Sequence, residues 1–239
     1  MSGHSKWATI KRAKAVTDAK RGAVFTKLGN AITIAAREKG GDVEANPSLR
    51  VAVEKAKSAN MPKDNIERAI KKGTGELAGD MVEELYYEAV LPNNVQIIIK
   101  CLTDNKNRSA ATVRHALSKA GGSLSSVMWN FEKKGVISIL REALDEKNIN
   151  IEELELELIE KDIEDFILED EGLSIYTKVE ELQLIKDFID KKDLKMESAD
   201  IAYVPKSRIE LATEDKSKLD NFLETLEELE DVNDFYLNL

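Results

Sequence analysis

A run of basic side chains near the start of the chain has the residue types and the density needed to hold an anionic polymer. Between residues 4 and 27, seven lysines and arginines face a single acid, Asp18. Cations at this density attract phosphate groups, and the indole ring of Trp7 can stack on a base or a ribose. The candidate nucleic-acid contacts in this stretch are His4, Ser5, Lys6, Trp7, Lys11, Arg12, Lys14, Lys20, Arg21 and Lys27.

Two plainer interpretations of this stretch stay open. Trp7 can pin the tail to the first helix, and the lysines can form an ordinary solvated helix face. The nucleic-acid hypothesis differs from both because it requires the cations and the ring to act on one ligand.

A second candidate contact surface lies on a short predicted helix from about Pro62 to Lys72. Asn65, Arg68 and Lys72 fall at i, i+3 and i+7, on one helical face opposite Ile66 and Ile70. A helix that reads the major groove needs such an arrangement, and the preceding turn of about three residues is compatible with a helix-turn-helix.

The segment from Asp104 to Arg108 has two interpretations. Its Asp and Asn residues are typical of an Asx turn that caps a following helix. Alternatively, backbone N–H groups at that helix start, together with Lys106 and Arg108, hold a phosphate.

Other motifs indicate neither catalysis nor a cofactor. The two histidines, His4 and His115, have no second metal ligand at helical spacing, and Gly73-Thr74-Gly75 follows a predicted helix where a dinucleotide fingerprint would follow a strand. The many paired carboxylates of the last third lie beside leucines, as on solvated helix faces. We therefore expect a non-enzymatic protein without metal or cofactor.

The net charge of −10 conceals a strong asymmetry along the chain. Residues 1–75 carry 16 basic and 7 acidic side chains, residues 76–141 carry 8 and 7, and residues 142–239 carry 11 and 31. Binding depends on the local field, so an acidic total is compatible with a nucleic-acid-binding first segment.

The length of 239 residues predicts two or three domains. No apolar run approaches the roughly 20 residues of a membrane span, and no apolar stretch follows the basic N-terminus as in a secretory signal. The single cysteine, Cys101, alternates with apolar residues and is expected to be a buried strand thiol. We expect a cytoplasmic monomer.

The first third reads as three helices. Phe25, Leu28, Ile32 and Ala35 mark one face of a helix that ends at Gly40-Gly41. A second helix begins at Asn46-Pro47 with Leu49, Ala52, Val53 and Ala56 inward, and the third is predicted to end at Gly73.

After the third helix, the spacing of apolar residues changes from the helical period to the alternation that is typical of strands. Leu85 to Ala89 and Val95 to Cys101 alternate around Leu91-Pro92-Asn93-Asn94, which predicts a hairpin whose asparagines can adopt positive φ. A helix with Val113 and Leu117 inward follows and ends at Gly121-Gly122, giving ββα.

From Gly135 the order of predicted elements is βαββαβ, the ferredoxin-like unit, with its first strand predicted from Val136 to Leu140. The C-terminus is predicted to form one more helix, with apolar positions at Leu219, Phe222, Leu223 and Leu226, and one more strand. These two elements cannot form a domain alone, so we infer that they return to complete the ββα unit. The predicted fold class is α+β, with a basic helical domain at 1–75, a discontinuous ββα…αβ domain at 76–134 plus 206–239, and an inserted acidic ferredoxin-like domain at 135–205.

Several motifs together resemble one known family, YebC/PmpR. These are Met1 to Trp7, Asp18-Ala-Lys-Arg21, Phe25-Thr-Lys-Leu28, Asn60 to Gly73, Thr103 to Arg108 and Asp231 to Asn238. The resemblance covers the chain nearly end to end. It implies a three-domain architecture and a regulator of gene expression, described either as a DNA-binding transcriptional regulator or as a ribosome-associated translation factor.

The sequence departs from that family at two turns. Leu91-Pro92-Asn93-Asn94 replaces a Gly-Pro-Gly-Gly hairpin turn, and the loop after Gly122 is a few residues shorter than in relatives. We name DNA first because the resemblance implies a transcriptional regulator, and the face with Asn65, Arg68 and Lys72 favours a groove. Ribosomal RNA stays the alternative because a basic arm with an aromatic ring suits unstacked bases, and a pure protein adaptor is the third hypothesis.

Overall fold

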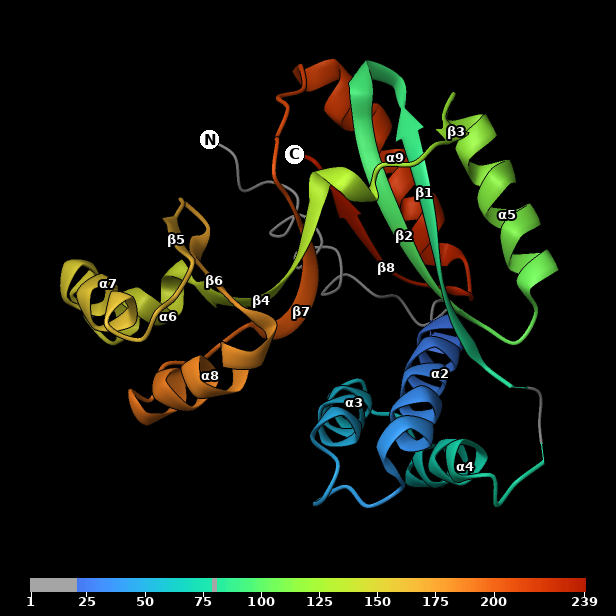
Figure 1. Ribbon diagram of the computed structural model, residues 1–239, viewed down its shortest axis with the longest axis horizontal. Helices are drawn as coiled ribbons and strands as arrows, with labels where there is room; N and C mark the ends of the chain where they lie inside the picture. Colours follow the sequence, from blue (N-terminus) through green and yellow to red (C-terminus); the bar gives the residue numbers. More distant parts are fainter. Residues whose placement is uncertain (1–20, 79–80) are drawn as a thin grey trace. The chain divides into compact units, whose positions relative to one another are not determined.

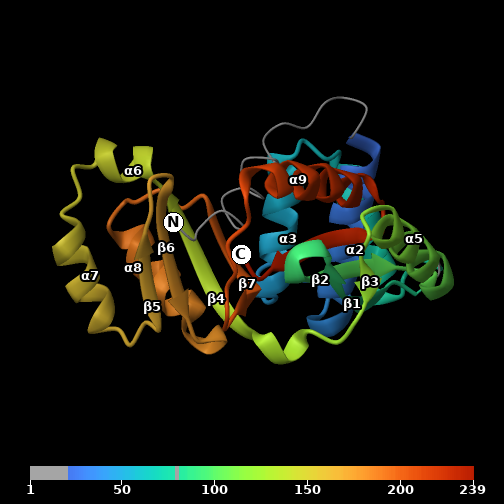
Figure 2. The ribbon, with the colours of Figure 1, turned by 90° about the horizontal axis from the view of Figure 1, so that it is seen from above.

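The computed structural model describes residues 21–78 and 81–239 (Figures 1 and 2). The described chain divides into two compact units. Residues 21–127 with Leu211–Phe235 form one unit, and Met128–Glu210 with Tyr236–Leu239 form the other. Within the described ranges, no helix has the length and apolarity needed to cross a membrane.

The first unit begins with the three predicted helices, α2 (Arg21–Lys39), α3 (Pro47–Ser58) and α4 (Lys63–Thr74). Their shared core is rich in alanine and contains Ile32, Leu49, Val53 and Ile66. Asn46 caps α3, since its side-chain oxygen accepts a hydrogen bond from the backbone N–H of Leu49 at 3.1 Å. The predicted start of α3 and its four inward residues are confirmed.

The predicted end of α4 is wrong by two residues. Gly73 lies inside the helix, and Gly75 is the C-cap with φ of +82°. A Cβ on Gly73 would lie 2.4 Å from the carbonyl oxygen of Thr33, so glycine is there to let α4 approach α2 closely. The inward residue in the last part of α4 is Ala69, while Ile70 is only half-buried.

A four-stranded antiparallel sheet completes this unit. The hairpin of β1 (Glu83–Leu91) and β2 (Val95–Thr103) turns through the 3-10 segment η2 (Pro92–Asn94), where Asn93 and Asn94 have φ of 61° and 59°. The prediction of positive φ at these asparagines is confirmed. Cys101 is fully buried on β2, as expected.

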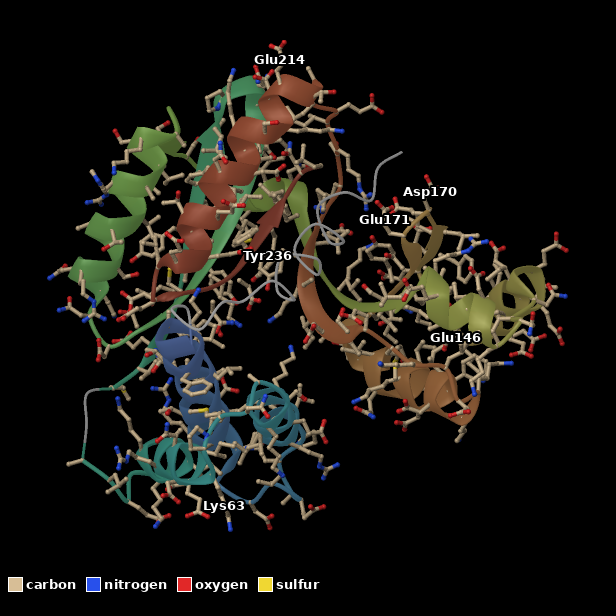
Figure 3. The ribbon with its side chains drawn as sticks, turned by 180° about the vertical axis from the view of Figure 1, so that it is seen from behind. Lys63, Glu146, Asp170, Glu171, Glu214 and Tyr236 are labelled. Atoms are coloured by element: carbon tan, nitrogen blue, oxygen red, sulfur yellow. The ribbon has the colours of Figure 1, made fainter. Side chains whose placement is uncertain are left out.

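The C-terminal strand β8 (Val232–Leu237) lies beside β2, and the sheet order is β3-β1-β2-β8. β3 (Ser123–Leu124), which the sequence did not reveal, pairs with the end of β1. Helices α5 (Lys106–Lys119) and α9 (Thr213–Glu228) lie side by side on one face of the sheet (Figure 3). The last helix and strand therefore complete the sheet that β1 and β2 begin, as inferred from the sequence.

The second unit has the ferredoxin-like order. Its antiparallel sheet of β4 (Phe131–Leu140), β5 (Asp165–Leu168), β6 (Gly172–Thr177) and β7 (Ser198–Pro205) is arranged β5-β6-β4-β7. Helices α7 (Ile151–Ile159) and α8 (Leu182–Lys191) supply Leu154, Leu158, Ile185 and Ile189 to its main core. The 3-10 segments η3 (Met128–Asn130) and η4 (Val179–Glu181) precede β4 and α8.

Two details of this unit differ from expectation. β4 begins at Phe131, five residues before the predicted Val136, because its first half pairs with the end of β7. A short helix α6 (Arg141–Glu146) was missed because six residues give too few turns for a periodic pattern. The predicted α+β class, with N-terminal helices and two antiparallel sheets, is confirmed.

Candidate nucleic-acid interface

The predicted trio lies on α4, and only Arg68 among the three is fully exposed to solvent. Ile66 and Ala69 turn into the helical core, which fixes the rotation of α4 about its axis, directs Arg68 away from that core and leaves Asn65 and Lys72 at its edge. Arg68 is exposed, and Asn65 and Lys72 are half-buried. Within residues 21–78 and 81–239, no acceptor engages the Arg68 guanidinium.

Other basic side chains lie on α3 and α4. Lys71 and Lys72 occupy the last turn of α4, and Lys55 and Lys57 occupy the last turn of α3, where the helix dipole favours positive charge. Lys63, at the first turn of α4, lies 3.6 Å from the carboxylate of Glu67 and is partly compensated. The basic character of α4 is therefore concentrated toward its C-terminal end.

Lys27 has a structural partner. Its ammonium donates a hydrogen bond of 2.5 Å to the backbone carbonyl of Glu227, in the last turn of α9. The last carbonyls of a helix lack intrahelical donors, so Lys27 satisfies one of them and ties α2 to α9. Its role as a nucleic-acid contact stays a prediction, and in this geometry the ammonium is already engaged.

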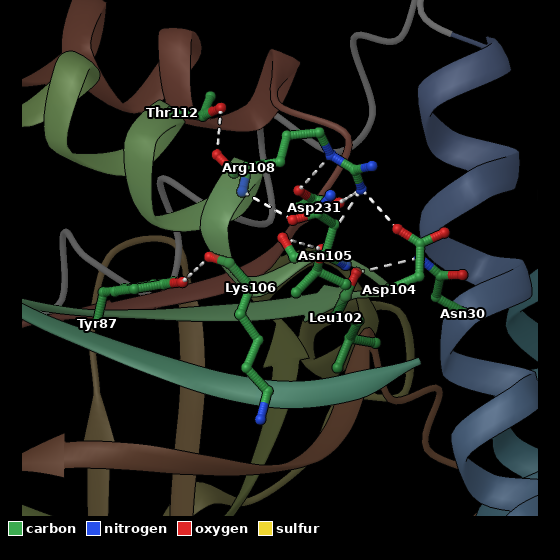
Figure 4. Close-up of polar contacts among 10 residues, drawn as sticks. Asn30, Tyr87, Leu102, Asp104, Asn105, Lys106, Arg108, Thr112 and Asp231 are labelled. Carbon is green, nitrogen blue, oxygen red and sulfur yellow. Dashed lines mark hydrogen bonds and ion pairs between the residues drawn. The ribbon is translucent and has the colours of Figure 1, made fainter. Parts of the chain in front are cut away.

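The segment from Asp104 to Arg108 forms a cap and an ion-pair cluster (Figure 4). The side-chain oxygen of Asn105 accepts a hydrogen bond of 3.0 Å from the backbone N–H of Arg108, which begins α5. The Arg108 guanidinium bonds Asp231 at 2.9 and 3.4 Å and Asp104 at 2.8 Å. The hydrogen bond to Asp231, followed by that to Asp104, raises the pKa of Arg108 further above its usual range.

This cluster therefore has a clear structural function. Arg108 joins the start of α5 to Asp231, the residue before β8, and two carboxylates compensate its charge. Lys106 is also paired, at 2.7 Å from the carboxylate of Glu83. A phosphate contact by Lys106 or Arg108 stays a prediction and would have to displace these acids.

The predicted basic arm lies mostly outside the described residues. This holds for His4, Ser5, Lys6, Trp7, Lys11, Arg12, Lys14 and Lys20. Arg21 is the first residue of α2.

Sequence reasoning missed a further basic surface, the C-terminal half of α5. This helix contains Lys106, Arg108, Arg114 and Lys119 and no acidic residue. Arg114, His115 and Lys119 are exposed, and within the described part of the chain no acid pairs with them. The signal was present in the sequence, because residues 105–131 contain no Asp or Glu, but averaging over residues 76–141 concealed it.

Comparisons with known proteins identify the family. One family model, described as the TACO1/YebC protein N-terminal domain, matches residues 5–76, and a second, the TACO1/YebC second and third domain, matches residues 82–239. A "Probable transcriptional regulatory protein" of Pseudothermotoga lettingae is 46% identical over 241 residues, covering 100% of this chain and 93% of the relative. Another with that description, from Desulforapulum autotrophicum, is 44% identical and covers 100% of this chain and 96% of the relative.

A solved structure supports the same family assignment. The crystal structure of a conserved hypothetical protein from Aquifex aeolicus has a TM-score of 0.81 and 41% sequence identity, covering 94% of this chain and 92% of that one. Fold, length and motifs thus match over nearly the whole chain. The chain belongs to the TACO1/YebC family, as its YebC/PmpR motifs predicted.

Proposed function

We propose that this protein is a non-enzymatic, cytoplasmic regulator of gene expression that binds DNA. The observation that carries the proposal is the exposed, uncompensated Arg68, held between Asn65 and Lys72 on the outer face of α4. The relatives whose printed description is "Probable transcriptional regulatory protein" support the same class.

The geometry of α3 and α4 suits a helix laid in a groove. Four residues, 59–62, join the two helices, and the turn contains Asn60 with φ of 59° and the buried Met61. With α4 in a major groove, Arg68 can donate to O6 and N7 of guanine, and Asn65 can pair with an adenine edge. Lys71 and Lys72 would then meet phosphates, which position the protein without reading sequence.

Selection of duplexes from a random-sequence pool, followed by affinity measurements, tests this proposal. Arg68→Ala should cost about 1–3 kcal/mol against the selected sequence and much less against unrelated DNA. Arg50→Ala is the matched control, because the Arg50 guanidinium already bonds the carbonyls of Val43 and Glu44. Equal losses on both kinds of DNA would contradict base reading by Arg68.

A ribosome-associated translation factor is the second candidate. The unpaired cations of α5, in addition to the arm containing Trp7, favour it because scattered basic surfaces suit irregular RNA. Crosslinking in cells, followed by sequencing of DNA and RNA from one sample, separates the candidates. Recovery of promoter-proximal DNA supports the first, recovery of ribosomal RNA supports the second, and recovery of neither above a charge-matched control protein contradicts both.

A further inference from the structure

A cavity of about 400 Å³ opens in the first unit, between the C-terminal end of α5, the N-terminal three turns of α9 and the tip of the β1–β2 hairpin. The two helices that form its walls lie side by side in Figure 3. Its floor is apolar and contains the buried side chains of Leu91, Val95, Ala116, Leu219 and Phe222. Cavities that take small organic ligands have about this volume and this mainly apolar lining.

The rim of this cavity carries a small set of polar groups. The side-chain amides of Asn93 and Asn221 have no hydrogen-bond partner among the residues described, so each offers both a donor and an acceptor. The hydroxyl of Thr225 donates to the backbone carbonyl of Asn221 at 3.0 Å and keeps its lone pairs available. An apolar floor with amides at its edge is suited to a flat heteroaromatic ring with polar edges.

Positive charge lies beside the same cavity. Lys119 lines the cavity and has no carboxylate partner in the described part of the chain. The ammonium of Lys218, which also lines the cavity, forms an ion pair with the carboxylate of Asp215 at 3.1 Å. His115 precedes Lys119 by four residues and shares its face of the acid-free α5, whereas Arg114 lies on another side of the helix. A phosphate at the edge of the cavity would therefore meet the ammonium of Lys119 on a helix that contains no acidic residue.

We propose that this cavity holds one unstacked base of a single-stranded nucleic acid, with the phosphate of that nucleotide at Lys119. The apolar floor covers the faces of the base, and the amides of Asn93 and Asn221 contact its polar edge. The inference rests on nucleic-acid binding as the proposed function and adds a second contact site outside the arm and α4.

The test uses the full-length protein with labelled methyl groups and two probes. One probe is a set of nucleoside monophosphates, and the other is a fluorescein-labelled single-stranded oligonucleotide of about 12 nucleotides, each in ribose and deoxyribose forms. The methyl resonances of Val95, Ala116 and Leu219 are followed while each probe is titrated into the protein. Shifts of these methyl groups and their neighbours are expected with both probes, and the two backbone forms identify whether RNA or DNA is preferred.

Three variants sharpen the test. Lys119→Gln should lower the slope of log affinity against log salt by about 0.7, the value for one phosphate contact on a single strand. Asn221→Leu should keep that slope and change the preference among the four bases. Lys216→Gln, an exposed lysine of α9 outside the cavity, is the control and should change neither.

The outcomes separate the two proposals. If the oligonucleotides bind, but the cavity methyl groups do not shift and Lys119→Gln keeps the full salt slope, the cavity proposal is wrong and the proposed function stands. If the unmodified protein binds neither these strands nor duplex DNA, both are wrong. Thermal unfolding of each variant, expected within 2 °C of the unmodified protein, verifies that lost binding is not lost folding.

Discussion

The outer face of α4 and the start of α5 contain the same kinds of residue and differ in their partners. Arg68 on α4 is exposed and has no acceptor among the described residues, whereas Arg108 on α5 bonds Asp231 and Asp104. Asp104 is local in sequence, but Asp231 comes from more than 120 residues away and reaches Arg108 only in the folded sheet. An arginine is therefore available to a ligand only where the fold supplies no carboxylate for it.

The largest expected effect on stability tests the close packing of α4 against α2. Gly73→Ala should lower the free energy of unfolding by about 3 kcal/mol, because the added Cβ would lie 2.4 Å from the Thr33 carbonyl oxygen. Denaturant unfolding measures this loss. Gly75→Asn is the control, since asparagine tolerates the positive φ of the cap and nothing lies within 4 Å of its Cβ. Equal stability of Gly73→Ala and the unmodified protein would show that α2 and α4 do not pack closely.

The next largest effect is the pH dependence of stability that the buried Cys101 on β2 contributes. Burial, assisted by the charge of Asp231, raises the pKa of the Cys101 thiol from 9.0 to about 11. A raised pKa contributes stability that is complete below pH 9 and is lost as the pH rises toward 11. Relative to Cys101→Ala, the protein should therefore lose about 2–3 kcal/mol between these pH values. Parallel pH dependence of the two proteins would contradict this burial.

Arg108→Ala should have a smaller effect on stability, about 1–2 kcal/mol. The Asp231 side chain is only 13% exposed and would lose its partner, but the Arg108 side chain is 53% exposed, so water screens its charge. Arg108→Lys keeps the charge and loses the bidentate contact with Asp231, so this variant should recover only part of the lost stability. The salt dependence of nucleic-acid binding should not change, and a reduced slope would show that Arg108 contacts phosphate.

The smallest expected effect on stability is that of Arg68→Ala, within about 0.5 kcal/mol of the unmodified protein. The side chain is exposed and has no partner in the described residues, so its removal leaves no buried group unsatisfied. Thermal unfolding and binding measured on the same preparation complete the comparison with Arg108. A large stability loss for Arg68→Ala would place Arg68 in a structural network.

Periodic and capping signals were the parts of the sequence that predicted structure best. Asn46-Pro47 predicted the start of α3, and the four apolar positions Leu219, Phe222, Leu223 and Leu226 predicted the buried face of α9. Such signals are local, because a helix buries residues at fixed spacing whatever lies opposite. The two-residue strand β3 and the short helix α6 were not predicted, since neither is long enough to show a period.

The sequence by itself determined the longer helices and strands, the charge asymmetry and the family, because each depends on residue types at short spacing. Only the tertiary structure decided which cations are paired and where a cavity opens. Lys27 donates a hydrogen bond to a backbone carbonyl of α9, and Arg108 forms an ion pair with Asp231. Lys119 borders a cavity whose floor comes from α5, α9 and the β1–β2 hairpin. These are contacts between residues up to 200 positions apart, and only the packed fold brings such residues together.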